Sequence, residues 1–169
     1  TYCDPYFNNG NADGDYINAF SLNEVNLTAI GAGGVSFYND YTSSIAQVLA
    51  GNSYTINAQG GDYSSDTYKV WVDWNNDGIF DDGTEALAPS YSTSSEFENM
   101  TFTFTVPADA ALGNKRLRMV CSDNSLVLPC QQDSYGEYLE ITVAVVAEIG
   151  VQNLMAENIT LFPNPGRDN

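Results

Sequence analysis

Apolar and polar residues alternate with a period of two in several segments, and this alternation constrains the fold more than any other feature. In "MTFTFTV", the Phe102, Phe104 and Val106 side chains fall on one face and three threonines on the other. A strand of this kind belongs in a sheet with one buried face and one solvent-exposed face. The pattern predicts an all-β protein, an antiparallel β-sandwich of the jelly-roll or immunoglobulin-like kind with long loops. Comparable segments are 53–58, 68–74, 115–120 and 138–146.

Helix is expected to be scarce. Only residues 43–51 and 107–113 could form helical turns, and both segments are too short to be stable without tertiary packing. The second is better interpreted as a connection between strands. The longest apolar run, residues 143–147, is far shorter than the roughly 18 residues of a membrane helix, so no membrane insertion is expected.

The charge balance is strongly acidic. The chain has 22 acidic and 5 basic residues, for a net charge of −17. Nucleic acids and anionic membrane surfaces would be repelled by such a protein, and cations are its natural partners. The 11 Tyr, 8 Phe and 2 Trp residues favour a folded, aromatic core over disorder. The acidity is therefore expected on a folded surface.

The chain is predicted not to be an enzyme. It has no histidine, which excludes Ser/His/Asp and Cys/His nucleophile arrangements and zinc sites that need imidazole. A glycosidase needs two carboxylates that flank a cleft, one of them with a raised pKa. Asp73 beside Trp71 and Trp74 is the only local arrangement with these ingredients, and no residue there is marked as a general acid.

The segment "VWVDWNNDGIFDDGTE", residues 70–85, joins a strand to an acidic turn. Its first half alternates, and Asp73, Asn75 and Asp77, followed by a glycine, then match the first half of a D-x-[DN]-x-[DN]-G calcium loop. Calcium takes six to eight oxygen ligands and accepts irregular geometry, whereas magnesium requires a near-ideal octahedron. We therefore expect Ca²⁺ as cofactor. The candidate ligands are Asp73, Asn75, Asp77, the Ile79 carbonyl, Asp81 and Glu85.

The match to a calcium loop is incomplete. Thr84 stands where a bidentate Glu is expected, and Glu85 follows one residue late. No flanking helix is predicted, so the site would be carried by strands. The alternative is a hairpin in which Asp77 and Gly78 form the turn and the carboxylates are solvated. Repulsion between such close like charges favours neutralisation by calcium.

Aromatic residues suggest a second kind of site. Exposed Trp and Tyr side chains stack on sugar rings, so Trp71, Tyr68 and Tyr91 are candidates for carbohydrate binding. The alternative is that these rings fill the core and its edges. That alternative is favoured for Trp74, which shares a strand face with Val70 and Val72.

Three cysteines leave one thiol unpaired. Cys130 could pair with Cys121 across a short loop or with Cys3 at the amino terminus, and the spacing alone does not decide between them. A structural bridge is favoured over a redox role because neither pair has CxxC spacing and no histidine is available as a base.

Four stretches, in order, resemble one family: "YNDYTSSIAQVLAGNSYTINA", "YKVWVDWNNDGIFDDGTE", "FTFTVPADAALGNKRLRM" and "PCQQDSYGEYLEITV". Together they are similar to the GEVED domain, a β-sandwich module of large secreted and surface proteins of Bacteroidota. The resemblance implies one such domain over residues 1–147. It also implies a Cys3–Cys130 disulfide, because a cysteine near the start and one in a Pro-Cys pair often occur together in this family.

The Gly-Glu-Val-Glu-Asp signature of that family is only partly present. Gly136 and Glu137 match, whereas Tyr138, Leu139 and Glu140 replace the last three residues. A polar contact made by the second Glu of the signature cannot be made by Leu139.

Residues 148–169 form a linker and a tail. The end, "ITLFPNPGRDN", resembles the opening of a type IX secretion sorting domain, and only this beginning of the domain is expected here. The resemblance implies export by the type IX secretion machinery. A low Lys content and abundant Asn, Ser, Thr and Tyr are also typical of a secreted or cell-surface protein.

The favoured function is that of a non-catalytic secreted or cell-surface module for adhesion or display, stabilised by calcium. One alternative is a carbohydrate-binding accessory module that brings a secreted hydrolase or protease to a polysaccharide or cell-surface glycan. Another is a surface fibre assembled from copies of the chain, since edge strands are templates for pairing.

Overall fold

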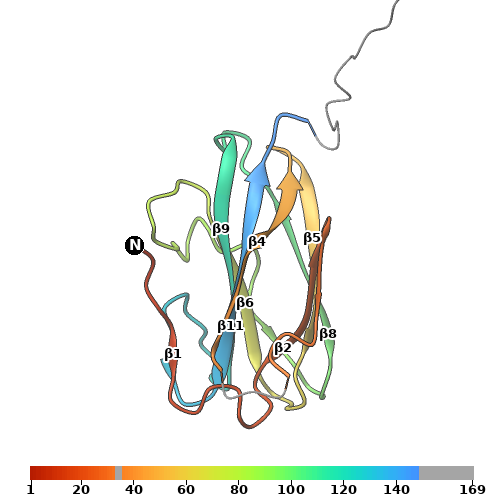
Figure 1. The fold of residues 1–169 in the computed structure, drawn as a ribbon, viewed down its shortest axis with the longest axis vertical. Coiled ribbons are helices and arrows are strands. Elements are labelled where there is room, and N and C mark those ends of the chain that lie inside the picture. The colour runs from red at the N-terminus through yellow and green to blue at the C-terminus, as the bar shows by residue number, and fades with distance from the viewer. Residues whose placement is uncertain (33–35, 149–169) are drawn as a thin grey trace, which may run out of the picture.

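Two β-sheets packed face to face form the protein in a computed structural model, which describes residues 1–32 and 36–148 (Figure 1). The predicted β-sandwich is confirmed, and the described residues contain no helix. The strands are β1 (Tyr6–Phe7), β2 (Ile17–Leu22), β3 (Val25–Thr28), β4 (Tyr38–Val48), β5 (Ser53–Gly60), β6 (Thr67–Asp73), β7 (Tyr91–Ser92), β8 (Asn99–Thr105), β9 (Gly113–Ser122), β10 (Gln132–Asp133) and β11 (Gly136–Val145).

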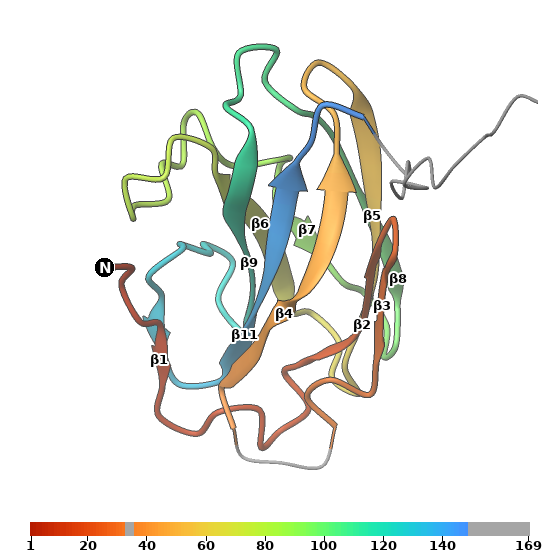
Figure 2. The same cartoon turned by 45° about the horizontal axis from the view of Figure 1, so that its top comes forward.

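The strands are divided between two large sheets and one small one. One sheet has five strands in the order β4-β11-β9-β6-β7, and the other has four in the order β3-β2-β5-β8. Figure 2 shows β4, β11 and β9 side by side, with the β2, β3, β5 and β8 layer beside them. The short strands β1 and β10 pair in parallel outside the sandwich.

One strand pair departs from the predicted antiparallel arrangement. All pairs within the two large sheets are antiparallel except β4 and β11, which are parallel. The helical turn considered for residues 43–51 is wrong, because residues 43–48 lie in β4. There Ala46 and Val48 are fully buried while Ile45 is exposed, which is the alternation of a strand. Residues 107–112 connect β8 to β9, as predicted.

The main core lies between the two sheets. Val70 and Val72 of β6 and Phe102 and Phe104 of β8 point into it, together with Trp74 just beyond β6. Full burial of each such aliphatic or aromatic side chain contributes about 1.5–3 kcal/mol relative to an exposed one. The alternation read from these segments therefore marks the core-facing side chains.

A second core covers the outer face of the five-stranded sheet. Trp71 on β6, Val120 on β9 and Tyr138 on β11 form its floor. Its cover comes from three segments outside the two large sheets and includes Phe7, Phe80 and Val127. Figure 1 shows β1 and the loop between β9 and β11 lying beside this sheet. The outer face of this sheet, which a simple sandwich would expose to solvent, is therefore buried over much of its area.

A disulfide holds the cover of the second core in place. Cys3 and Cys130 are bonded, as the family resemblance implied, and Cys121 is a buried free thiol. The bond joins the segment before β1 to the loop that contains β10. It therefore fixes the two segments whose short strands pair over the sheet.

Candidate functional site

The acidic turn follows directly from the end of β6, and Asp73 is its most buried member. The Asp73 side chain is fully buried. Its Oδ2 atom accepts hydrogen bonds from the Tyr2 hydroxyl at 2.7 Å and from the Gly78 N–H at 3.0 Å. Its Oδ1 atom is also buried and has no hydrogen-bond partner. One oxygen of this carboxyl group is thus available to a ligand.

Side-chain-to-backbone hydrogen bonds shape the next four residues. The Asn75 Oδ1 atom accepts the Asp77 N–H at 2.8 Å, and the Asp77 Oδ1 atom accepts the Ile79 N–H at 2.8 Å. Gly78 adopts a φ of 83°, which a glycine tolerates without strain. Asn75 and Asp77 are exposed, and their oxygens keep unused lone pairs. These lone pairs could coordinate a cation.

Glu85 closes the turn from the other side. It is 3% exposed, and its two carboxylate oxygens accept the Trp74 N–H at 3.0 Å and the Asp81 N–H at 2.9 Å. Burial, helped by the nearby Asp73 carboxylate, raises the pKa of Glu85. Glu85, which stands one position later than the calcium-loop pattern requires, therefore lies beside Asp73.

The Asp81 carboxylate, unlike that of Asp73, has one oxygen that accepts several hydrogen bonds within the turn. Its Oδ1 atom accepts hydrogen bonds from the Thr84 hydroxyl, the Thr84 N–H and the Gly83 N–H, and these bonds lower its pKa, the Thr84 hydroxyl first. In residues 1–32 and 36–148, no group of three or more His, Cys, Asp or Glu side chains could hold a metal ion. Amide and backbone oxygens can also bind a cation, so the six-residue calcium set stays a prediction.

The predicted sugar-stacking surface is wrong for two of its three residues. Trp71 and Tyr68 are fully buried. The Trp71 ring lies in the second core and its indole N–H donates to Asp82, while the Tyr68 hydroxyl donates to the Tyr16 carbonyl in the interior. Tyr91 is half-buried and its hydroxyl donates to Glu98. The face expected to be open is covered by loops whose docking no local pattern reveals.

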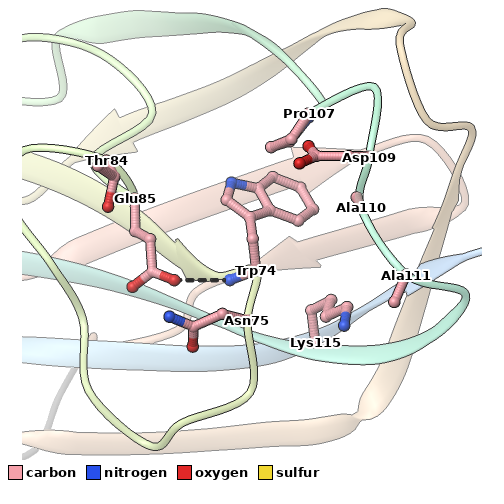
Figure 3. A pocket seen from close by; sticks show the side chains of 9 residues that line it. All are labelled: Trp74, Asn75, Thr84, Glu85, Pro107, Asp109, Ala110, Ala111 and Lys115. Carbon is pink, nitrogen blue, oxygen red and sulfur yellow. Dashed lines mark hydrogen bonds between the residues drawn. The ribbon is translucent and has the colours of Figure 1, made fainter.

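A pocket of about 330 Å³ opens beside the acidic turn. Figure 3 shows the Trp74 ring at its centre, with Pro107 and Asp109 on one side and Glu85 on the other. Lys115 of β9 also lines it. The sequence did not predict this pocket, because its walls come from the acidic turn, from the connection between β8 and β9, and from β9 itself.

The matched part of the family signature has a structural role. Glu137 is fully buried, and it accepts the Ile17 N–H at 2.7 Å and the Asn11 amide at 3.0 Å. Burial raises its pKa to about 7. Gly136 has a φ of 141°, and a Cβ there would lie 2.2 Å from the Cys121 carbonyl oxygen. Glu137 therefore joins β11 to the amino-terminal loop and to β2, and Gly136 allows the close approach of the Cys121 backbone on β9.

Comparison with known families and structures gives one specific match. Residues 67–142 match the family model of the GEVED domain. This match confirms the resemblance over the segment that contains β6, the acidic turn, the pocket and the signature. No curated protein matches the chain. The tail that resembles a sorting domain falls almost entirely within residues 149–169, outside the described residues, and stays a prediction.

Several solved structures are distantly similar. The CARDB domain of a Pyrococcus furiosus protein, solved by NMR, is 17% identical, with 60% of this chain and 87% of that one covered and a TM-score of 0.35. A crystal structure of the same domain in complex with di-metal ions is 16% identical, with 60% and 86% covered and a TM-score of 0.36. A family 123 glycoside hydrolase from Clostridium perfringens is 8% identical, with 61% and 23% covered and a TM-score of 0.37.

Proposed function

We propose that this chain, which contains a match to the GEVED family, is a non-catalytic extracellular β-sandwich module for adhesion or display whose acidic turn binds calcium. The observation that carries the calcium proposal is the Asp73 Oδ1 atom, which is buried and has no donor. A buried carboxylate oxygen without a partner is costly in free energy, and an ion at this position would remove the cost.

The surroundings of Asp73 supply negative charge and further oxygen atoms that suit a calcium ion. Glu85 lies close enough to raise the negative potential at Asp73, and the chain carries a net charge of −17. Asn75 and Asp77 offer further oxygens, and the Ile79 carbonyl follows at the spacing of a calcium loop. Oxygen ligands of mixed kind on an irregular loop suit calcium better than magnesium.

Removal of calcium is expected to lower the melting temperature. Binding at a free calcium concentration about 100-fold above the Kd stabilises a protein by about 2.7 kcal/mol. For a domain of this size, that corresponds to roughly 5–10 °C in Tm. Calorimetry in EGTA, then with calcium or magnesium restored, measures the effect. Recovery is expected with calcium alone.

Two variants make the test specific to the turn. Asp73→Asn should abolish the calcium response, whereas Glu96→Gln, which removes the same charge from an exposed position, should keep it. A wild-type melting curve that is identical in EGTA and in calcium would disprove the proposal.

The pocket beside the turn supports carbohydrate binding as a second function. Its volume lies in the range of small-molecule sites, roughly 300–1,000 Å³, and it combines the Trp74 ring with charged groups from Asp109 and Lys115. A sugar presents an apolar face to a ring and hydroxyls to such groups. A sugar in this pocket would contact the acidic turn, which the proposed calcium ion would stabilise.

A glycan array tests this function. Asp109→Ala is expected to weaken any glycan signal by about tenfold, a loss of about 1.4 kcal/mol, because it removes an exposed hydrogen-bonding group and leaves the core intact. Tyr91→Phe, which lies outside the pocket, should bind as the wild type does. Glycan binding that survives Asp109→Ala unchanged would place the sugar elsewhere.

A further inference from the structure

Lys115 occupies a position on β9 where the strand faces the interior. Further along the strand, Leu117, Met119 and Cys121 lie in the main core between the two sheets. Successive side chains of a strand alternate between its faces, so Lys115 lies on the same face as these three. The residue is 4% exposed. Lysine is almost never buried to this extent unless it is paired with an acidic group.

The Lys115 ammonium group has no partner among the described residues. The other basic side chains of that part of the chain, Lys69, Arg116 and Arg118, each form an ion pair with a carboxylate. Lys115 forms none. In Figure 3 the hydrogen bond drawn within the pocket joins Glu85 to the Trp74 backbone, and none reaches Lys115. Removal of an ammonium group from water without a partner is costly in free energy.

The ammonium group opens onto the pocket beside the acidic turn. The Lys115 Nζ atom makes no hydrogen bond, yet it is not one of the enclosed polar atoms of the described residues. It is therefore reached by solvent, although almost the whole side chain is buried. Lys115 lines the pocket of about 330 Å³ together with Trp74, so this reachable part of the side chain faces the space where a ligand would lie.

The two acidic residues of the pocket leave this positive charge unpaired. Both carboxylate oxygens of Glu85 accept backbone N–H groups, at 3.0 Å and 2.9 Å. Asp109 is exposed, and Figure 3 shows no hydrogen bond between it and Lys115. The pocket therefore offers a ligand an acceptor at Asp109, on its exposed side, and a charged donor at Lys115, on its buried side.

We propose that the pocket selects a sugar that bears a carboxylate group, of the uronic acid class, with the carboxylate on Lys115. This inference rests on the carbohydrate function proposed for the pocket and names the class of sugar. A hydrogen bond between an ammonium group and a carboxylate is roughly twice as strong as one between neutral groups. A neutral sugar would leave Lys115 without an ion pair. The Trp74 ring and Asp109 would contact the apolar face and the hydroxyl groups of the sugar.

The charge of the protein limits how acidic the ligand is. The chain carries a net charge of −17, which repels every negative charge on a glycan, whereas Lys115 compensates a single one. Repulsion between exposed charges is screened beyond about 8 Å at physiological ionic strength, so an isolated acidic group pays little for its approach. The expected ligand is therefore a largely neutral glycan with single or terminal uronic acid units.

Isothermal titration calorimetry with two matched ligands tests the inference. One ligand is an oligosaccharide that ends in a single glucuronic acid, and the other is the methyl ester of the same oligosaccharide. The acid is expected to bind about tenfold more tightly than the ester. Lys115→Met keeps the length of the side chain and should reduce the affinity for the acid to that for the ester. Lys69→Met, which removes a cation outside the pocket, should keep the preference.

The melting temperature of Lys115→Met without ligand gives a second readout. An unpaired lysine that serves a ligand adds nothing to the stability of the empty domain. Lys115→Met should therefore melt at the temperature of the wild type or above it, as is common when a functional group is replaced. A clear decrease in the melting temperature would show that Lys115 has a structural partner and would overturn the inference.

The inference and the carbohydrate function can fail separately. Equal affinity for acid and ester, weakened in Asp109→Ala, would overturn the preference for a uronic acid and keep the pocket as a sugar site. A preference for the acid that survives Lys115→Met would also overturn the inference. No binding of either oligosaccharide, together with a glycan array that shows no bound sugar, would overturn both.

Discussion

Replacement of Arg118 by methionine is expected to lower the free energy of unfolding by about 3–5 kcal/mol, the usual cost of breaking a buried ion pair by removal of one partner. Arg118 and Glu140 are almost fully buried, with the Arg118 Nη2 atom 2.7 Å from the Glu140 Oε1 atom. The guanidinium also donates to the Pro129 carbonyl at 2.7 Å and lies against the Phe80 and Tyr138 rings. Without it, Glu140 retains the half-buried Arg116 and the Tyr38 hydroxyl, both at its Oε2 atom, and its Oε1 atom loses its donors.

Urea denaturation measures the change, and two further variants interpret it. Lys69→Met removes a cation whose partner, Asp82, is about half exposed, so the expected loss is below about 1 kcal/mol. The double variant Arg118→Met with Glu140→Gln should recover part of the stability, because the stranded carboxylate is gone. A loss below about 1 kcal/mol for Arg118→Met would show that the pair is solvated.

Removal of the disulfide is expected to lower the free energy of unfolding by about as much as Arg118→Met does. Cys3 and Cys130 are 127 residues apart in sequence, and the chain-entropy model gives about 4–5 kcal/mol for a loop of that length. The loss expected in the double variant Cys3→Ser with Cys130→Ser is therefore close to the whole free energy of unfolding of a marginally stable domain, since typical values are about 5–15 kcal/mol.

Guanidinium denaturation with and without a reductant measures this contribution. The wild type should lose stability in the reductant, and the double serine variant should show no further loss. Cys121→Ala, which leaves the bridge intact, should keep the response to the reductant. Equal stability of the wild type in both conditions would show that the bridge does not limit unfolding.

The main core could be predicted because it depends on a local pattern. A strand such as β8 exposes its threonines and buries Phe102 and Phe104, and that alternation is visible in seven residues. The half calcium motif in the acidic turn is equally local, and its Asn75 and Asp77 side chains accept backbone N–H groups of the turn, while its calcium ligands stay a prediction. The GEVED resemblance was also visible, since its motifs are contiguous.

The second core could not be predicted in the same way. Trp71 is buried because three separate segments, which contain Phe7, Phe80 and Val127, cover it, and alternation along β6 does not report what docks on the outer face. The misread segment at 43–51 has the same cause, since pairing with β11 decides its conformation.

The position of the disulfide determines how the domain would carry a pulling force. A load applied before Cys3 and after β11 passes through the Cys3–Cys130 bond and bypasses the chain between these cysteines. Only the stretch after Cys130 remains free to lengthen, and it contains β11, which is held between β4 and β9. That stretch can extend by at most about 3.3–3.6 Å per residue. Under tension the domain would therefore behave as a short, stiff link and would keep most of its sandwich intact.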